Sequence, residues 1–145
     1  MKDFHFDAIS AFENYEIKEM KDGHVEVTTK VVDSSLNYYG NAHGGYLFTL
    51  CDQISGLVLI SLGLDVVTLQ SSINYLKAGK RDDVLTIKGE CVHQGRTTCV
   101  VDVAIINQDG KNVCKATFTM FVTGHRSEER SEEHTSELQS LGAIS

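Results

Sequence analysis

One long apolar stretch, Tyr46 to Leu64, limits most strongly how this 145-residue chain can fold. It is long enough for about five helical turns. Polar or small residues interrupt it, among them Thr49, Asp52, Gln53, Ser55 and Gly56. A membrane span rarely tolerates that mixture. We therefore expect a buried central helix from His43 or Gly44 to about Leu62, which the rest of the chain must cover.

The chain after this helix favours β-structure. Four β-branched or alternating runs predict strands, at Val66–Leu76, Val84–Val92, Thr97–Asn107 and Val113–Val122. Asp109-Gly110 predicts a hairpin between the last two. The short turns at 77–83 and 94–96 favour antiparallel neighbours. The fold class is therefore α+β, with a curved antiparallel sheet wrapped around one helix.

The segment before the helix carries weaker signals. Ile9 and Phe12 predict a short amphipathic helix over Asp7–Asn14. Tyr15–Met20 and His24–Val32 flank Lys-Asp-Gly and predict a hairpin. A polar loop follows at 34–42. Asn41 is a plausible N-cap for the long helix, and Gly63 a plausible stop.

Composition excludes several classes of function. The net charge of −7 argues against nucleic-acid binding, which needs a basic face. Cys51, Cys91, Cys99 and Cys114 lie singly, without the spacing of metal ligands, so we expect no metal and reduced, buried thiols. The chain starts without a signal-peptide pattern. We therefore expect a cytoplasmic protein with no membrane partner.

The last twenty residues, 126–145, differ in character from the rest. Arg126-Ser-Glu-Glu repeats at Arg130-Ser-Glu-Glu. The run RSEEHTSELQS resembles the translation of a common DNA-sequencing adapter, although a genuine solvated acidic tail is the ordinary alternative. We expect a single domain over residues 1–125, followed by a disordered tail that is foreign to the natural protein.

The segment Asn41-Ala-His-Gly-Gly45 indicates a catalytic site. A Gly-Gly pair at a helix start leaves backbone N–H groups uncovered at the positive end of the helix dipole, where an oxyanion is stabilised. Asp52 is the only charge between His43 and Asp65 if histidine is neutral. A lone carboxylate in an apolar helix is costly unless it has a partner or a role. The combination suggests an acyl-transfer site.

Two polar patterns accompany this site. Thr49, Asp52, Gln53 and Gly56 share one helix face, which lies either toward solvent or toward a partner subunit. In the next strand, strict alternation would place four polar residues on one side: Thr68, Gln70, Ser72 and Asn74. They either line a site or face water.

The region from about Val31 to Val122 resembles the hotdog-fold acyl-CoA thioesterases of the phenylacetate-degradation (PaaI-like) type. The most specific part is Asn37-x5-His43-Gly44-Gly45-x6-Asp52. Ile73-Asn-Tyr75 and His93-Gln-Gly-Arg-Thr97 support it.

The resemblance implies a set of roles. Asp52 acts as general base for water or as nucleophile, and the Gly44 amide contacts the oxyanion. Asn37 holds the attacking water or the thioester. His43 supports the loop or the thioester sulfur. Thr68 assists Asp52, although the stretch from Gly63 departs from the family pattern, which weakens the assignment of Thr68.

The resemblance also implies the substrate and the assembly. Acyl-CoA is the substrate, with aryl or medium-chain acyl groups, and no cofactor is needed because coenzyme A is part of the substrate. Five residues are expected to bind it beside Gly45: Tyr75, His93, Gly95, Arg96 and Thr97. Such proteins form homodimers with shared sites, and dimers pair into tetramers.

Three other functions compete with this hypothesis. A non-catalytic acyl-CoA sensor or binding subunit would keep the pocket but has no need of Asp52. A hydratase or dehydratase of the same fold would use a different histidine motif. A purely structural oligomer leaves the Gly-Gly pair and Asp52 unexplained.

Overall fold

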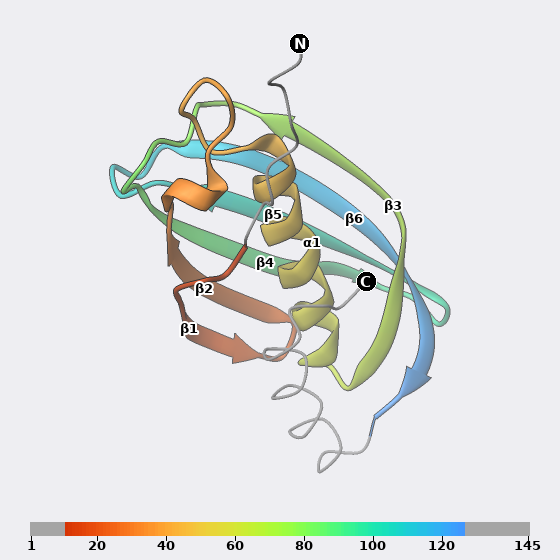
Figure 1. Cartoon of the computed structure of the whole chain (residues 1–145). Helices are drawn as coiled ribbons and strands as arrows, with labels where there is room; N and C mark the ends of the chain where they lie inside the picture. The colour runs from red at the N-terminus through yellow and green to blue at the C-terminus, as the bar shows by residue number, and fades with distance from the viewer. Residues whose placement is uncertain (1–10, 127–145) are drawn as a thin grey trace.

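The computed structural model describes residues 11–126, which form one curved antiparallel sheet around one helix. The elements are β1 (Tyr15–Lys21), β2 (His24–Lys30), a 3-10 turn η1 (Asp33–Ser35), α1 (Gly44–Ile60), β3 (Leu64–Tyr75), β4 (Val84–Gln94), β5 (Thr98–Ile106) and β6 (Asn112–His125). Figure 1 shows α1 lying across the concave face of the sheet. The expected α+β class is confirmed.

The strand order is β1-β2-β4-β5-β6-β3, which differs in one respect from the prediction. The loop 77–83 does not join neighbours: β3 pairs with β6, and β4 pairs with β2 and β5. Short loops favour adjacent strands, but here the chain crosses the end of the sheet so that strands on both sides can cover α1. As a result β3 is an outer strand of the sheet.

Helix α1 begins and ends almost where the sequence predicts. Its N-cap is His43, however, and not Asn41, because His43 Nδ1 accepts a hydrogen bond from the Gly45 N–H (3.0 Å). Asn41 instead forms a bridge with Lys80 in the loop. The helical segment ends at Ile60, and Gly63 has φ +80°, a backbone conformation that suits glycine.

The core lies between α1 and the inward face of the sheet. Alternate residues of β5, Cys99, Val101, Val103 and Ile105, are buried against the helix side. Gly89 on β4 lets the helix approach, since a Cβ there would lie 2.7 Å from Val58 Cγ2 and 2.9 Å from Ile54 Cγ2. The four cysteines are free thiols; Cys91 is half-buried and the other three are buried. Within the described residues, no helix is long and apolar enough to cross a membrane.

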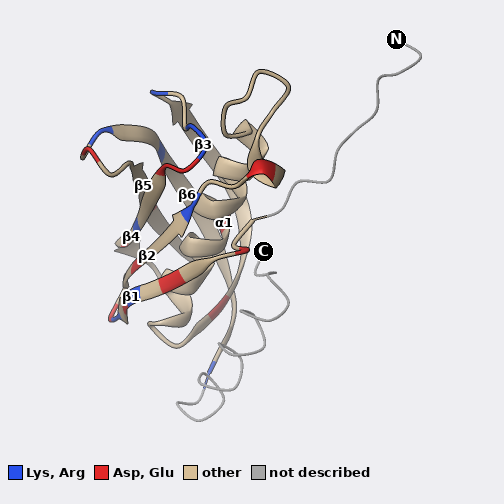
Figure 2. Ribbon diagram, turned by 60° about the vertical axis from the view of Figure 1, so that its left-hand side comes forward, with Lys and Arg blue, Asp and Glu red and all other residues tan. Residues whose placement is uncertain are grey.

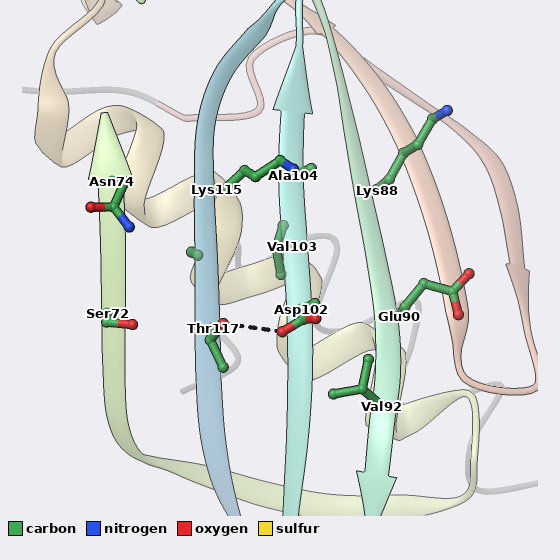
Figure 3. Close-up of a pocket in the computed structure, with 11 residues that line it drawn as sticks. Ser72, Asn74, Lys88, Glu90, Val92, Asp102, Val103, Ala104, Lys115 and Thr117 are labelled. Atoms are coloured by element: carbon green, nitrogen blue, oxygen red, sulfur yellow. Dashed lines mark hydrogen bonds between the residues drawn. The ribbon is translucent and has the colours of Figure 1, made fainter. Parts of the chain in front are cut away.

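A β-bulge in β3 changes the predicted alternation, in which four polar residues from Thr68 to Asn74 would lie on one side of the strand. Thr68 pairs with Met120, but the next pair is Gln70 with Thr119, so Leu69 is an extra residue. Thr68 therefore faces α1, whereas Gln70 and the alternate residues after it face outward. Figure 3 shows Ser72 and Asn74 on the outer face, beside Asp102, Lys115 and Thr117 and with α1 behind the sheet.

The two ends of the described chain differ from the sequence-based prediction. The part of the predicted N-terminal helix that is described, residues 11–14, is not helical, and residues 7–10 lie outside the described residues. The adapter-like segment from residue 127 onward also lies outside them. Arg126 itself belongs to the fold, because its N–H donates to the Gly63 carbonyl (2.8 Å). Its Nε lies 3.2 Å from Asp65 Oδ1, although the pair lacks hydrogen-bond geometry.

The close approach of α1 and β4 predicts that a larger residue at position 89 lowers the free energy of unfolding. Gly89→Ala would place a methyl group against Ile54 and Val58, and overpacking of this kind costs about 1–3 kcal/mol. We expect a loss of unfolding free energy in that range in urea titrations. Gly124→Ala is the matched control, because its Cβ would meet only Asp65 at 3.6 Å, and it should change stability by less than about 0.5 kcal/mol. Equal stability of the two variants would contradict the packing argument.

Candidate active site

The start of α1 and the end of β3 form a pocket of about 370 Å³. Ten residues line it: Asn37, Asn41, Ala42, Gly44, Leu47, Tyr75, Leu76, Lys77, Ala78 and Gly79. Three of these, Asn37, Gly44 and Tyr75, are predicted site residues, so the structure brings them together. The sequence predicts neither Leu76 nor Gly79 as a site residue, because they belong to a loop whose path depends on the strand order. Lys77 forms a small basic group with Lys80 and Arg81, which the sequence suggests either as a second contact for the phosphates of coenzyme A or as a solvated loop.

His43 fixes the beginning of the helix with its ring. Because Nδ1 accepts the Gly45 N–H, the neutral ring carries its proton on Nε2. The backbone N–H of His43 donates to the Ser35 carbonyl (2.7 Å), which ties the residue to η1. His43 therefore acts as a cap, and its Nε2–H remains available as a donor.

The Gly44 amide has the features of an oxyanion donor. Its N–H has no hydrogen-bond partner within residues 11–126, whereas the neighbouring N–H groups of His43 and Gly45 are both bonded. It lies at the positive end of a 17-residue helix. Glycine also leaves the amide accessible, because no side chain covers it. This position can stabilise negative charge on an incoming carbonyl oxygen.

Asn37 holds the loop that leads to the helix. Its Oδ1 accepts the N–H groups of Tyr39 (2.9 Å) and Asn41 (3.1 Å), and its backbone bonds to Asn41 and Gly40. With Oδ1 occupied, the group that Asn37 can offer in the pocket is the Nδ2 amide, a donor. A donor suits the thioester carbonyl or the oxygen of a water molecule.

Asp52 and Thr68 form the second group of predicted residues. Thr68 Oγ1 donates to Asp52 Oδ1 at 2.9 Å, and Asp52 is half-buried in the middle of α1. The hydrogen bond orients the carboxylate and leaves Asp52 as an acceptor for a proton. Thr68 faces the helix in phase with the buried Leu64 and Val66, and the bulge at Leu69 changes the faces of the residues that follow it.

The thiol next to Asp52 is unsuited to act as a nucleophile. Cys51 is fully buried, with its Sγ 3.9 Å from Cys114 Sγ. Hydrogen bonding to Cys114, together with burial, raises the pKa of Cys51 well above its ordinary value. A neutral, buried thiol is unreactive. Among the described residues, no group of His, Cys, Asp and Glu side chains could hold a metal ion.

Four predicted residues lie away from the Gly44 pocket, at the end of the sheet where β3 begins: His93, Gly95, Arg96 and Thr97. The Thr97 carbonyl accepts the Val122 N–H, and Val122 pairs with Val66 near the start of β3. Tyr75 is at the other end of β3, about 30 Å away for nine strand residues. Figure 1 shows the β4–β5 turn at the opposite end of the sheet from the start of α1. Within one chain, the structure therefore does not bring Arg96 to the pocket.

The charges around the pocket are few. Figure 2 shows Lys and Arg interspersed with Asp and Glu along strands and turns. Arg81 forms an ion pair with Asp33 (2.7 Å), so the small basic group of the 77–83 loop is partly neutralised. Lys77 lines the pocket and places a cation near Gly44.

Comparison with known proteins identifies the family. The profile of the Thioesterase superfamily matches residues 39–114, which contain the Gly-Gly pair, Asp52 and β3. A curated relative, the acyl-coenzyme A thioesterase PaaI of Escherichia coli, is 36% identical over 107 residues, covering 74% of this chain and 76% of that protein. The chain belongs to the thioesterase superfamily. It is a PaaI-like acyl-CoA thioesterase of the hotdog fold.

Two solved structures support this assignment. A hypothetical thioesterase protein from Streptococcus pneumoniae TIGR4, crystallised with coenzyme A, is 89% identical with a TM-score of 0.84, and the match covers 86% of this chain and 100% of that one. The smu.793 protein of Streptococcus mutans UA159, bound to acetyl CoA, is 66% identical with a TM-score of 0.78 and the same coverage. Thioesterases of this type need no cofactor.

If the hydrogen bond between Asp52 and Thr68 supports the reaction, its removal should lower kcat. Thr68→Val keeps the shape but removes the donor, and a hydrogen bond to a charged group contributes about 1.5–3 kcal/mol. We expect kcat for acyl-CoA hydrolysis to fall about ten- to a hundredfold, and Thr68→Ser to retain most of it. Thr117→Val is the matched control, because Thr117 makes the same bond to Asp102 (3.0 Å) on the outer face of the sheet. If Thr68→Val and Thr117→Val had equal kcat values, Thr68 would have no role in the reaction.

Proposed function

We propose that this protein hydrolyses aryl- or medium-chain acyl-CoA to the free acid and coenzyme A, with Asp52 and Gly44 as the central catalytic groups. The proposal rests on the combination of two groups on one helix. The Asp52 carboxylate is oriented by a hydrogen bond from Thr68, and the Gly44 N–H at the helix start has no hydrogen-bond partner within residues 11–126. The family supports the reaction class. The free thiols of the core fit a reducing, cytoplasmic location.

The reaction requires a base and an oxyanion donor. Asp52 takes a proton from water as the water oxygen attacks the thioester carbonyl carbon. The carbonyl oxygen becomes an oxyanion, which the Gly44 N–H stabilises more strongly in the transition state than in the ground state. The C–S bond then breaks, and the departing sulfur leaves as the thiol of coenzyme A after protonation. Direct attack by Asp52, through a mixed anhydride, is the second route.

The distance along α1 indicates that one chain does not supply both groups to the same thioester. Gly44 and Asp52 are eight residues apart, which is about 12 Å of helix. The Gly44 N–H points away from Asp52, so a bound oxyanion would lie about 15 Å along the axis from the Asp52 backbone. One aspartate side chain and one bridging water do not span this distance.

A second copy of the chain, paired through β3, would bring an Asp52 and a Gly44 to the same thioester. This strand is at the edge of the sheet, and edge strands carry unpaired backbone groups. Thr68 contacts Asp52, and Tyr75 contacts Gly44, so the two groups lie at different points of one strand. We infer that two β3 strands pair antiparallel about a two-fold axis near Ser71 and Ser72. Each Asp52 would then approach the Gly44 of the other copy.

The same pairing accounts for the distant turn 95–97. A two-fold axis at the middle of β3 would carry the start of one β3, with its neighbouring turn, to the end of the other. Arg96 would then lie near the pocket of the second copy, where Lys77 is already present. Two cations suit the phosphates of coenzyme A. Two such dimers would pair into a tetramer, as the resemblance to the family implies.

The first experiment is thiol release from a panel of acyl-CoA substrates by wild-type protein and by Asp52→Asn. We expect wild-type turnover and a fall of at least a hundredfold in kcat for the variant, because the base is lost. Asp102→Asn is the matched control, since it makes the same change on the outer face and should remain active.

Other outcomes would identify a different function. Tight binding of acyl-CoA without thiol release by the wild type would indicate the alternative, a non-catalytic acyl-CoA binding or sensing subunit. An Asp52→Asn variant as active as wild type would remove Asp52 from the mechanism. The ranking of acyl groups in the panel would define the specificity.

Mixed dimers test whether Asp52 and Gly44 act across two copies. Asp52→Asn and Gly44→Val should each be inactive alone, the latter because a β-branched side chain obstructs the amide. Co-expression of the two variants would generate hybrid dimers. If the groups act across the interface, each hybrid has one intact site, and the mixture should recover about a quarter of wild-type activity. If they act within one chain, no hybrid contains an intact site and the mixture stays inactive.

A further inference from the structure

Tyr75, at the end of β3, contacts the first peptide of α1. Its hydroxyl donates a hydrogen bond to the Gly44 carbonyl at 2.9 Å. The ring lies against Gly44, because a Cβ built there would be 3.5 Å from the Tyr75 Cζ and hydroxyl oxygen. Tyr75 pairs with Cys114, whose side chain is in the core, so Tyr75 faces the helix; the bulge at Leu69 lets it share this face with Thr68, seven residues before it.

The peptide between Gly44 and Gly45 is consequently held at both polar ends. Its carbonyl oxygen accepts from Tyr75, and its N–H donates to His43 Nδ1 at 3.0 Å. Two successive glycines have little conformational preference of their own, and the first turn of a helix lacks backbone acceptors for its N–H groups. These two side chains therefore add to the backbone bonds from the Leu47 N–H to the His43 carbonyl (3.0 Å) and from the His43 N–H to the Ser35 carbonyl (2.7 Å) in holding the helix start.

We propose that Tyr75 is a positioning residue, whose hydroxyl fixes the Gly44–Gly45 peptide and thereby the Gly44 Cα, through which this peptide is joined to the His43–Gly44 peptide that carries the Gly44 N–H. This inference rests on the proposed function, in which that amide stabilises the oxyanion. It replaces the sequence-based expectation that Tyr75 binds the substrate directly. Burial raises the pKa of Tyr75, so the hydroxyl stays protonated and remains a donor at neutral pH.

The consequence for catalysis follows from the geometry of an oxyanion donor. Such a donor must lie about 2.7–3.1 Å from the position of the oxyanion, and removing one completely lowers kcat about a hundred- to a thousandfold. Loss of the Tyr75 hydroxyl leaves the Gly44 N–H in place but releases one of the two side-chain contacts that hold the adjacent Gly44–Gly45 peptide. The effect should be smaller than complete removal and should fall on kcat, because the alignment matters most in the transition state.

Tyr75→Phe tests this role, because it removes the hydroxyl and keeps the ring. We expect kcat to fall about tenfold while KM changes less than twofold. Tyr39→Phe is the matched control, since the Tyr39 side chain is 84% exposed, and it should match wild type. A rise in KM with unchanged kcat would show that Tyr75 binds substrate, and unchanged kcat and KM would show that its hydroxyl has no role. Either result would overturn the proposal.

Amide hydrogen exchange provides a measurement that does not depend on turnover. We expect the Gly45 amide to exchange about tenfold faster in Tyr75→Phe than in wild type, because its peptide has lost one anchor, and to be unchanged in Tyr39→Phe and Asp52→Asn. Equal exchange rates in Tyr75→Phe and wild type would overturn the positioning role even if wild type hydrolyses acyl-CoA. A wild type without hydrolysis would instead refute the proposed function, whereas faster exchange would still support the anchor itself.

Discussion

The burial of α1 against the concave face of the sheet is the interaction on which the rest of the structure depends. The helix is apolar over most of its surface, and its central residues Leu50, Ile54 and Val58 are fully buried. Gly89 allows the close contact that this burial requires. Because α1 is held along its length, the amide at its start and the carboxylate in its middle occupy fixed positions. A site on such an element is more rigid than a site on a loop.

The bulge at Leu69 connects this packing to the site. In a regular strand, Thr68 and Tyr75 would lie on opposite faces, since they are seven residues apart. One extra residue places both on the helix side, where Thr68 reaches Asp52 and Tyr75 reaches Gly44. The same residue turns Ser72 and Asn74 outward, although the alternation of the sequence would group them with Thr68. The bulge at Leu69 therefore places Thr68 and Tyr75 on one face of an edge strand, where they contact the two groups that we propose for catalysis.

The arrangement also gives β3 two separate tasks. Its inner face contacts Asp52 and Gly44, the base and the oxyanion donor that we propose, while its edge is the surface that we propose for a second copy. Within one chain, Gly44 and Asp52 are too far apart to act on the same thioester. In the symmetric pair that we propose, one interface would complete two sites at once.

The sequence by itself determined the elements and the chemical groups, because both are local. Hydrophobic periodicity located α1 and the strands within a few residues, and the spacing of His43, Gly44 and Asp52 indicated the site. Only the tertiary structure decided that β3 is an edge strand, that His43 rather than Asn41 caps α1, and that Arg96 lies far from Gly44 in its own chain. These features follow from which strands pair and where the register shifts. Such choices result from competition among contacts that are distant in the sequence, and no local pattern records them.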